Sequence, residues 1–174
     1  MNRKMARRIK LGNSVTIGKD VWFNIIPEAT DEINIAIDDH CRIGPRSWIS
    51  AKNQIRLERD VILEPSVLIM DHSHAYENPN VPIKKQHLTA GGRILIERGC
   101  RIGAGAAILC SGSDLVLGQN SIVVPNAVVV RGQPAFSVIA GNPARVVDRL
   151  DPSQANVVSP SDPPEQVESA KQDH

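Results

Sequence analysis

A period of six residues runs through the sequence and restricts the folds that it can adopt. Pairs of aliphatic residues stand six positions apart, and a small or β-branched residue follows each of these anchors after four positions. The anchors are Leu11, Ile17, Ile37, Ile43, Leu57, Leu63, Ile96, Ile102, Leu117 and Val123. Third hexads follow several pairs, at Ile49, Ile69, Ile108 and Val129. Strict alternation and the 3.6-residue period of an amphipathic helix both fit the sequence poorly.

Each hexad predicts a short strand followed by a tight corner, and three hexads make a coil of 18 residues. The anchor points inward, the small residue fills the remaining space, and a glycine after several anchors permits a close or left-handed corner. Stacked coils pair their strands in parallel, so that several repeats bury one continuous core. Aromatic residues, which such a narrow core excludes, are only 3% of the chain. Cys41 and Cys100 fall in the small interior position, where we expect fillers and not nucleophiles.

Composition limits the class of protein. The 174 residues amount to one domain with a tail, and the net charge of +1 and the scarcity of aromatics argue against nucleic-acid binding. No apolar run approaches the length of a membrane span, and the basic N-terminal segment lacks the apolar region of a secretory signal. Three cysteines without metal-type spacing suit a reducing compartment, so we expect a cytoplasmic protein.

We expect two regions, a folded body over 1–150 and a disordered tail over 151–174. The tail is rich in proline and carries a net charge of −4, which leaves +5 on the body. Near the end of the body, Pro143 and the spacing of Val146, Val147 and Leu150 predict a short helix over about 143–150. This helix would cover the open end of the repeat and its unpaired strand edges.

An insertion interrupts the repeat over residues 75–95, with Pro79, Pro82 and the Gly91-Gly92 pair inside it. A loop of this length in a compact repeat is typical of a lid or binding loop. The segment Asp71-His72-Ser73-His74 stands directly before it. By themselves, these histidines fit metal ligands, a catalytic base with a neighbour, or ordinary surface residues. Asp71 either fixes the tautomer of a neighbouring imidazole or is an exposed turn residue.

Over roughly residues 10–145, the repeat resembles the hexapeptide-repeat proteins. That resemblance implies an all-β fold, a left-handed parallel β-helix with one protruding loop; the left hand comes only from the resemblance. The run ILEPSVLIMDHSHAYENPNVPI is similar to the active-site segment of the acetyltransferases of this family, especially the O-acetyltransferases of sugars and surface polysaccharides. The resemblance implies that His72 is the general base, which takes a proton from an acceptor that attacks acetyl-CoA. His74 corresponds to the family's second histidine, which would orient His72, contact the substrate or have no role. The resemblance also places an oxyanion-binding main-chain N–H near Ala104.

The segment Ala140-Gly141-Asn142-Pro143-Ala144-Arg145 resembles the coenzyme A-binding end of the same family. By position, Arg131 and Arg145 would meet the phosphates of acetyl-CoA, with main chain around Ala104 and Pro125 helping. The resemblance further implies a homotrimer with active sites between subunits, in which the insertion covers a neighbour's cleft. The acceptor would be a small molecule or glycan, and no metal is expected.

The resemblance leaves the acceptor open, since the acceptor-contacting positions of galactoside-type relatives fall on Gly44 and Lys52, and Arg101 replaces a tryptophan over coenzyme A. We expect an O-acetyltransferase acting on a sugar hydroxyl in lipopolysaccharide or surface polysaccharide biosynthesis. The alternatives are an N-acetyltransferase of an amino sugar, a metal enzyme of the γ-carbonic-anhydrase type, and a non-catalytic scaffold. The roles of His87 and Cys110 stay open.

Overall fold

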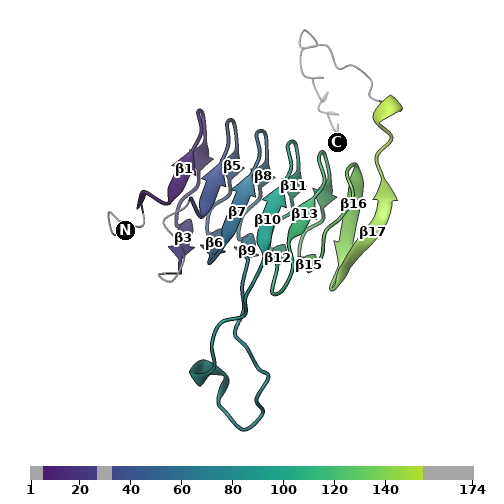
Figure 1. Ribbon diagram of the computed structural model, residues 1–174. Helices are drawn as coiled ribbons and strands as arrows, with labels where there is room; N and C mark the ends of the chain where they lie inside the picture. The colour runs from purple at the N-terminus through teal and green to yellow at the C-terminus, as the bar shows by residue number, and fades with distance from the viewer. Residues whose placement is uncertain (1–5, 27–32, 155–174) are drawn as a thin grey trace, which may run out of the picture.

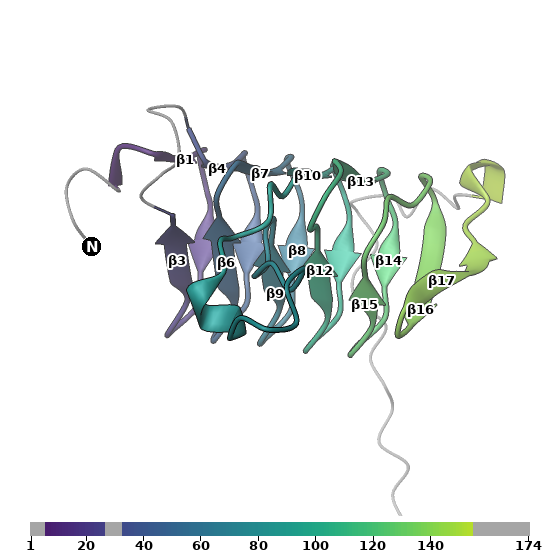
Figure 2. The same cartoon turned by 60° about the horizontal axis from the view of Figure 1, so that its bottom comes forward.

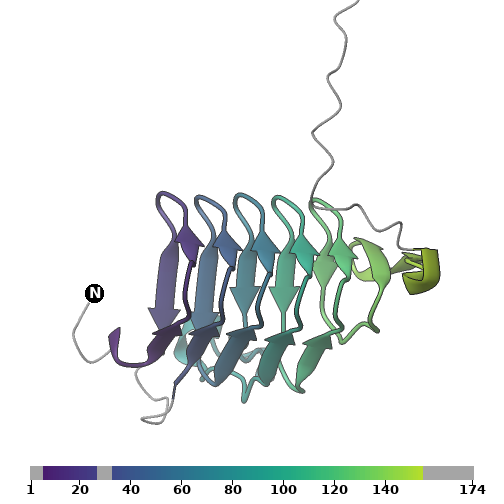
Figure 3. The ribbon, with the colours of Figure 1, turned by 90° about the horizontal axis from the view of Figure 1, so that it is seen from above.

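The computed structural model describes residues 6–26 and 33–154, which form a three-sided prism of parallel sheets (Figure 1). Sheet A holds β1 (Ile9–Leu11), β4 (Ile35–Ile37), β7 (Gln54–Leu57), β10 (Arg93–Ile96) and β13 (Leu115–Leu117). Sheet B holds β2 (Thr16–Ile17), β5 (Arg42–Ile43), β8 (Ile62–Leu63), β11 (Arg101–Ile102), β14 (Ile122–Val123), β16 (Ser137–Gly141) and β17 (Ala144–Arg149). Sheet C holds β3 (Trp22–Ile25), β6 (Trp48–Ala51), β9 (Leu68–Met70), β12 (Ala107–Leu109) and β15 (Val128–Val129). Viewed along another direction, the coils follow one another at regular spacing (Figure 3).

The six-residue period correctly predicted how the chain winds. The chain visits sheets A, B and C in turn, so that corresponding hexads of successive coils pair side by side in parallel. Ile37, Leu57, Ile96 and Leu117 are aligned across sheet A, and each is at most 1% exposed. The parallel β-helix of hexapeptide repeats is therefore confirmed.

The first coil departs from this pattern because it lies at the end of the prism. Its anchors Leu11 and Ile17 are 47% and 41% exposed, whereas the other eight anchors are buried. Both lie on the terminal strands of their sheets, β1 and β2, which have a neighbour on one side only. Residues 27–32, which follow β3, lie outside the described residues.

The corners contain two special positions. The glycine after an anchor serves close approach: a Cβ added at Gly44 would lie 2.3 Å from the carbonyl carbon of Glu64 in the next coil. The left-handed conformation occurs instead three residues after the anchors, for example at Asp60 (φ 62°) and Asn120 (φ 52°). The prediction was therefore correct about close contact, but the left-handed corner lies two residues further along the chain.

The helix predicted over about 143–150 is wrong, because these residues form β17, which runs antiparallel to β16. Gly141, with φ of 99°, and Ala144 pair across a two-residue loop, so the chain turns back at once. The β-branched Val146 and Val147 suit a strand. β17 pairs with β16 at the end of sheet B, so a strand takes the covering role expected of the helix.

The insertion leaves the prism after β9 and returns at β10, and therefore ends earlier than predicted, at Gly92. It projects away from the prism as a narrow arm (Figures 1 and 2) with a short 3₁₀ turn at Ile83–Lys85. Its stem is antiparallel, since Ala75 N–H donates to His87 O (2.9 Å) and Thr89 N–H to Ser73 O (2.8 Å).

Of the tail predicted to be disordered, only residues 151–154 are described, with a 3₁₀ turn at Pro152–Gln154; the remainder lies outside the described residues. In the described part of the chain, no helix has the length and hydropathy that a membrane span requires.

Candidate active site

The stem of the arm holds a buried carboxylate. Asp71 directly follows β9 and is 0% exposed. Its Oδ1 accepts a hydrogen bond from Lys52 N–H (2.7 Å) and its Oδ2 accepts one from Asn53 N–H (2.8 Å). These donors come from the tight corner between β6 and β7, one coil before. The two N–H groups satisfy a charge that would otherwise be costly to bury, which excludes the exposed-turn interpretation of Asp71.

His72 lies against this carboxylate and is 7% exposed. Its Nδ1 is 2.9 Å from Asp71 Oδ1. Because a carboxylate only accepts hydrogen bonds, Nδ1 carries the proton, and the lone pair of the neutral ring is on Nε2. An imidazole held in this way by a buried carboxylate has the tautomer and orientation that a general base needs.

The stem is tied to the prism by the same corner. Lys52 Nζ donates to Thr89 O (2.6 Å), and Asn53 Nδ2 donates to Ala90 O (3.0 Å). Gly92 N–H donates to Asp71 O (3.1 Å). Lys52 and Asn53 thus each contribute a main-chain and a side-chain donor, and these contacts between coils could not be derived from the sequence.

The other histidines of the arm lie apart from this pair. His74 is exposed, and its main chain pairs with Leu88 on the opposite side of the stem. Within the described residues, the ring of His72 is hydrogen-bonded to Asp71 and not to His74. His87 is exposed and lies 4.0 Å from Glu77. The catalytic role predicted for His74 stays a prediction, and the role of His87 stays open.

Ala104 lies at the corner where sheet B meets sheet C. In every coil, the residue two positions after the anchor makes no main-chain hydrogen bond through its N–H among the described residues. At the corner between sheets A and B, carboxylates take three of these groups: Asp39 binds Asn13 N–H, Glu58 binds Arg98 N–H and Glu97 binds Gln119 N–H.

At the corner between sheets B and C, the equivalent positions are Lys19, Pro45, Pro65, Ala104 and Pro125. Proline has no N–H, so beyond the first coil only Ala104 offers a donor at this corner. No described residue accepts a hydrogen bond from it. The open N–H of Ala104 could have been found from the sequence, because the prolines recur two residues after Ile43, Leu63 and Val123.

The chain does not bring all predicted site residues together. Ala104 precedes β12 and His72 follows β9, and since these neighbouring strands are parallel, the two residues lie at opposite ends of sheet C. Along the strand direction, Ala104 is level with residue 65, and seven residues separate residue 65 from His72. This corresponds to a distance on the order of 20 Å. Arg131 follows β15 at the His72 end, and Pro125 precedes β15 at the Ala104 end. Arg145 is exposed on β17, where its Nη1 donates to Ala144 O (2.8 Å).

The cysteines lie in the interior of the prism. Burial raises the pKa of Cys100 to about 11, and burial likewise raises the pKa of Cys41 and of Cys110. A raised pKa makes a thiol a poor nucleophile, which agrees with the filler role predicted for Cys41 and Cys100. Cys110 donates to Ser113 O, and both residues lie in the corner between β12 and β13. In residues 6–26 and 33–154, no group of three or more His, Cys, Asp and Glu residues could hold a metal ion.

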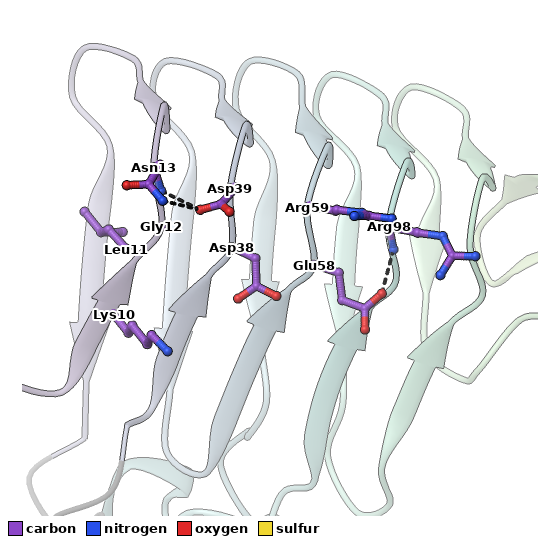
Figure 4. Close-up of a pocket in the computed structure, with 9 residues that line it drawn as sticks. All are labelled: Lys10, Leu11, Gly12, Asn13, Asp38, Asp39, Glu58, Arg59 and Arg98. Carbon is purple, nitrogen blue, oxygen red and sulfur yellow. Dashed lines mark hydrogen bonds between the residues drawn. The ribbon is translucent and has the colours of Figure 1, made fainter.

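Two cavities lie along the corners of the prism. One of about 570 Å³ lies at the corner between sheets A and B and is lined by charged residues, among them Lys10, Asp38, Glu58, Arg59 and Arg98 (Figure 4). A second of about 350 Å³ lies on sheet B, beside the corner of Ala104, and is lined by Arg42, Pro45, Glu64 and Pro65. Neither cavity is lined by His72.

No protein-family model matches the sequence. WbbJ of Escherichia coli K12, named as an O-acetyltransferase of lipopolysaccharide biosynthesis, is 24% identical over 124 residues, which are 67% of this chain and 61% of WbbJ. Serine acetyltransferase of Mycobacterium tuberculosis is 36% identical over 69 residues, which are 40% of this chain and 26% of that protein. The matched part therefore spans less than two thirds of either relative.

Solved structures share the fold at low identity. AntD, an N-acyltransferase from Bacillus cereus in complex with dTDP and 3-hydroxybutyryl-CoA, has a TM-score of 0.68 and 14% identity, over 83% of this chain and 74% of AntD. VCA0836, a hexapeptide-repeat acetyltransferase of Vibrio cholerae, has a TM-score of 0.66 and 24% identity, over 82% of this chain and 74% of VCA0836. Another structure of VCA0836 contains acetyl-CoA.

The fold is thus the left-handed parallel β-helix of the hexapeptide-repeat proteins, as the resemblance implied. The relatives and the solved structures that share it are acetyltransferases and an acyltransferase.

Asp71→Asn tests whether the buried carboxylate holds this site together. The amide cannot accept hydrogen bonds from both Lys52 and Asn53, so we expect a loss of about 2–4 kcal/mol in the free energy of unfolding, measured in urea. The exposed pair of Asp38 with Arg56 supplies the matched control, and Asp38→Asn should cost less than about 1 kcal/mol. In ¹⁵N NMR spectra, the proton of His72 should leave Nδ1 in Asp71→Asn only. An unchanged midpoint and an unchanged tautomer would contradict the assignment.

Proposed function

We propose that this protein is an acetyl-CoA-dependent acetyltransferase that transfers the acetyl group to a sugar hydroxyl. The observation that carries the proposal is the buried pair of Asp71 and His72, which leaves Nε2 of the ring as a proton acceptor. The likeness to WbbJ favours an oxygen nucleophile and a place in lipopolysaccharide or surface polysaccharide biosynthesis. The free thiols of Cys41, Cys100 and Cys110 suit the cytoplasm as its compartment.

The proposed reaction needs one base and one oxyanion donor. Nε2 of His72 takes the proton of the acceptor hydroxyl as its oxygen attacks the thioester carbonyl carbon. The resulting oxyanion accepts the hydrogen bond of Ala104 N–H. The intermediate then collapses, the carbon–sulfur bond breaks, and the imidazolium returns its proton to the leaving thiolate. The products are an acetyl ester and coenzyme A, and no covalent enzyme intermediate forms.

Coenzyme A would lie along the corner of Ala104, on the side of Pro125. The free N–H of Ala104 fixes the position of the thioester, and the prolines on either side present no competing donor. Arg145 on β17 and Arg131 after β15 are exposed in the last coils of the prism, which suits contacts with phosphate groups. Arg131 lies at the edge of sheet C opposite Ala104, so within one chain it is the more distant of the two from this corner.

Because one chain keeps His72 and Ala104 at opposite ends of sheet C, the proposed site needs a second copy. We propose a homotrimer in which His72 of one subunit faces the Ala104 corner of the next. The outward side of sheet C suits such contacts: Trp22, Trp48, Leu68, Ala107 and Val128 are aligned across it. The rings of Trp22 and Trp48 stack at 4.8 Å and are 58% and 43% exposed.

The proposal is tested by the release of coenzyme A from acetyl-CoA with a panel of sugars and amino sugars. We expect turnover with a hydroxyl acceptor, and His72→Ala should lower it by about 10²–10⁴ while acetyl-CoA still binds. His87→Ala is the matched control on the same arm and should keep most of the activity. Acetylation of amino sugars alone would replace the O-acetyltransferase by an N-acetyltransferase. Unchanged turnover in His72→Ala would remove the general base.

Ala104→Pro removes a single N–H at a position where three other coils already hold proline. The fold should therefore tolerate it, and Asn126 N–H can still donate to the carbonyl of residue 104. We expect turnover to fall by about 10²–10³ with little change in the melting temperature, as for the loss of one oxyanion donor. Lys19→Pro removes the equivalent N–H from the first coil and should leave turnover unchanged. Wild-type turnover in Ala104→Pro would show that this N–H takes no part.

A further inference from the structure

The smaller cavity continues the line of the Ala104 corner toward the N-terminal end of the prism. It is lined by Thr16, Arg42, Gly44, Pro45, Glu64 and Pro65, among others. Pro65 is in the coil directly before Ala104, and its carbonyl accepts the N–H of Gly105 (3.0 Å). The volume of about 350 Å³ lies at the small end of the range for ligand pockets, about 300–1,000 Å³, and suits a monosaccharide.

The reaction geometry leads to this cavity. If the thioester carbonyl lies at Ala104 N–H and coenzyme A extends toward Pro125, the acceptor has to approach from the opposite side. Its reacting oxygen must come within about 3–3.5 Å of the carbonyl carbon. Along the same corner, the space on that side of Ala104 is the cavity between the first three coils.

The charge of the cavity is set by Arg42. This side chain is exposed on the outer side of sheet B, where it is aligned between Thr16 and Ile62. Among the described residues, no carboxylate lies within ion-pair distance of Arg42. The acid of the cavity, Glu64, is bound by Arg101, with Nε at 3.1 Å and Nη2 at 3.0 Å from its Oε1. In the part of the chain that the structure describes, the cavity therefore offers one positive charge without an ion-pair partner.

We infer that this cavity binds the acceptor and that Arg42 holds an anionic group on it, a carboxylate or a phosphate. The inference rests on the proposed function and narrows its acceptor to an acidic sugar or a sugar phosphate. A guanidinium matches both anions, since it donates two parallel hydrogen bonds to a pair of oxygens. The hydroxyl of Thr16 and the main chain at Gly44 supply polar contacts for a sugar ring, and Pro45 and Pro65 supply apolar surface.

The larger cavity is the less suitable acceptor site. Its acids are occupied, since Asp38 pairs with Arg56. Asp39 binds Asn13 and Glu58 binds Arg98 N–H (Figure 4). It lies at another corner, away from both Ala104 and His72. It does provide a control, because Arg59 is also exposed there and has no ion pair among the described residues.

The test compares Arg42→Gln with Arg59→Gln in the full chain. Binding and acetylation are measured with glucuronate, glucose 1-phosphate and neutral glucose. We expect wild type to prefer an anionic sugar, and Arg42→Gln to raise its KM and Kd by about tenfold or more. The KM and Kd for glucose should change little in either variant, and Arg59→Gln should have the wild-type KM and Kd for all three sugars. If Arg42→Gln raises KM and Kd for glucuronate alone, the anionic group is a carboxylate. If it raises them for glucose 1-phosphate alone, the group is a phosphate.

The proposal is overturned if neutral glucose binds as well as both anionic sugars, or if neither anionic sugar binds to wild type. It is also overturned if Arg42→Gln leaves their KM and Kd unchanged. These outcomes are distinct from failure of the proposed function. Acetyl-CoA binding and its slow hydrolysis without an acceptor should be equal in wild type and Arg42→Gln. Their absence from wild type would contradict the acetyltransferase itself.

Discussion

The side chain that points into the prism at every sixth residue is the constraint on which the rest of the structure depends. The interior admits one aliphatic anchor and one small residue per hexad, and Ile37, Leu57, Ile96 and Leu117 are buried in one line along sheet A. This spacing fixes the length of each strand and thus the position of each corner. The corners are therefore in register from coil to coil, so equivalent corner positions of successive coils lie side by side along each edge of the prism.

This register determines which main-chain groups are open to a substrate. After the anchors of sheets A and B, the N–H two residues further along has no main-chain partner among the described residues, and the two corners differ in what becomes of it. At the corner between sheets A and B, carboxylates bind three of these groups, and at the corner between sheets B and C, prolines remove three. Ala104 interrupts the prolines, so that beyond the first coil it provides the one preorganised donor in this row. A donor fixed in this way stabilises developing charge without rearrangement during the reaction.

The hexapeptide repeat made the prism predictable, whereas the contacts between coils could not be predicted. Anchors and small positions follow a local rule, so the burial of Cys41 and Cys100 could be derived from their place in the hexad. The helix predicted over 143–150 failed because pairing with the open edge of β16 outweighed a local pattern of apolar residues. The binding of Asp71 by the main chain of Lys52 and Asn53 carries no side-chain signature and could not be derived from the sequence.

The candidate active site likewise has one feature that the sequence predicts and others that only the structure shows. The position of His72 before the arm was visible in the sequence, whereas its orientation by Asp71 needed the structure to distinguish it from an exposed turn. The separation of His72 from Ala104 also follows from the winding of the chain, since sheet C lies between them. That separation leads to the central claim, that base and oxyanion donor come from different subunits.

Subunit mixing tests this claim most directly. His72→Ala and Ala104→Pro chains with different tags are expressed together, and the mixed oligomers are purified through both tags. In a cyclic trimer, each mixed assembly contains one site with both groups intact, so activity should return to roughly a third of wild type although each variant alone is inactive. Mixed trimers that stay as inactive as the separate variants would show that both groups act within one chain.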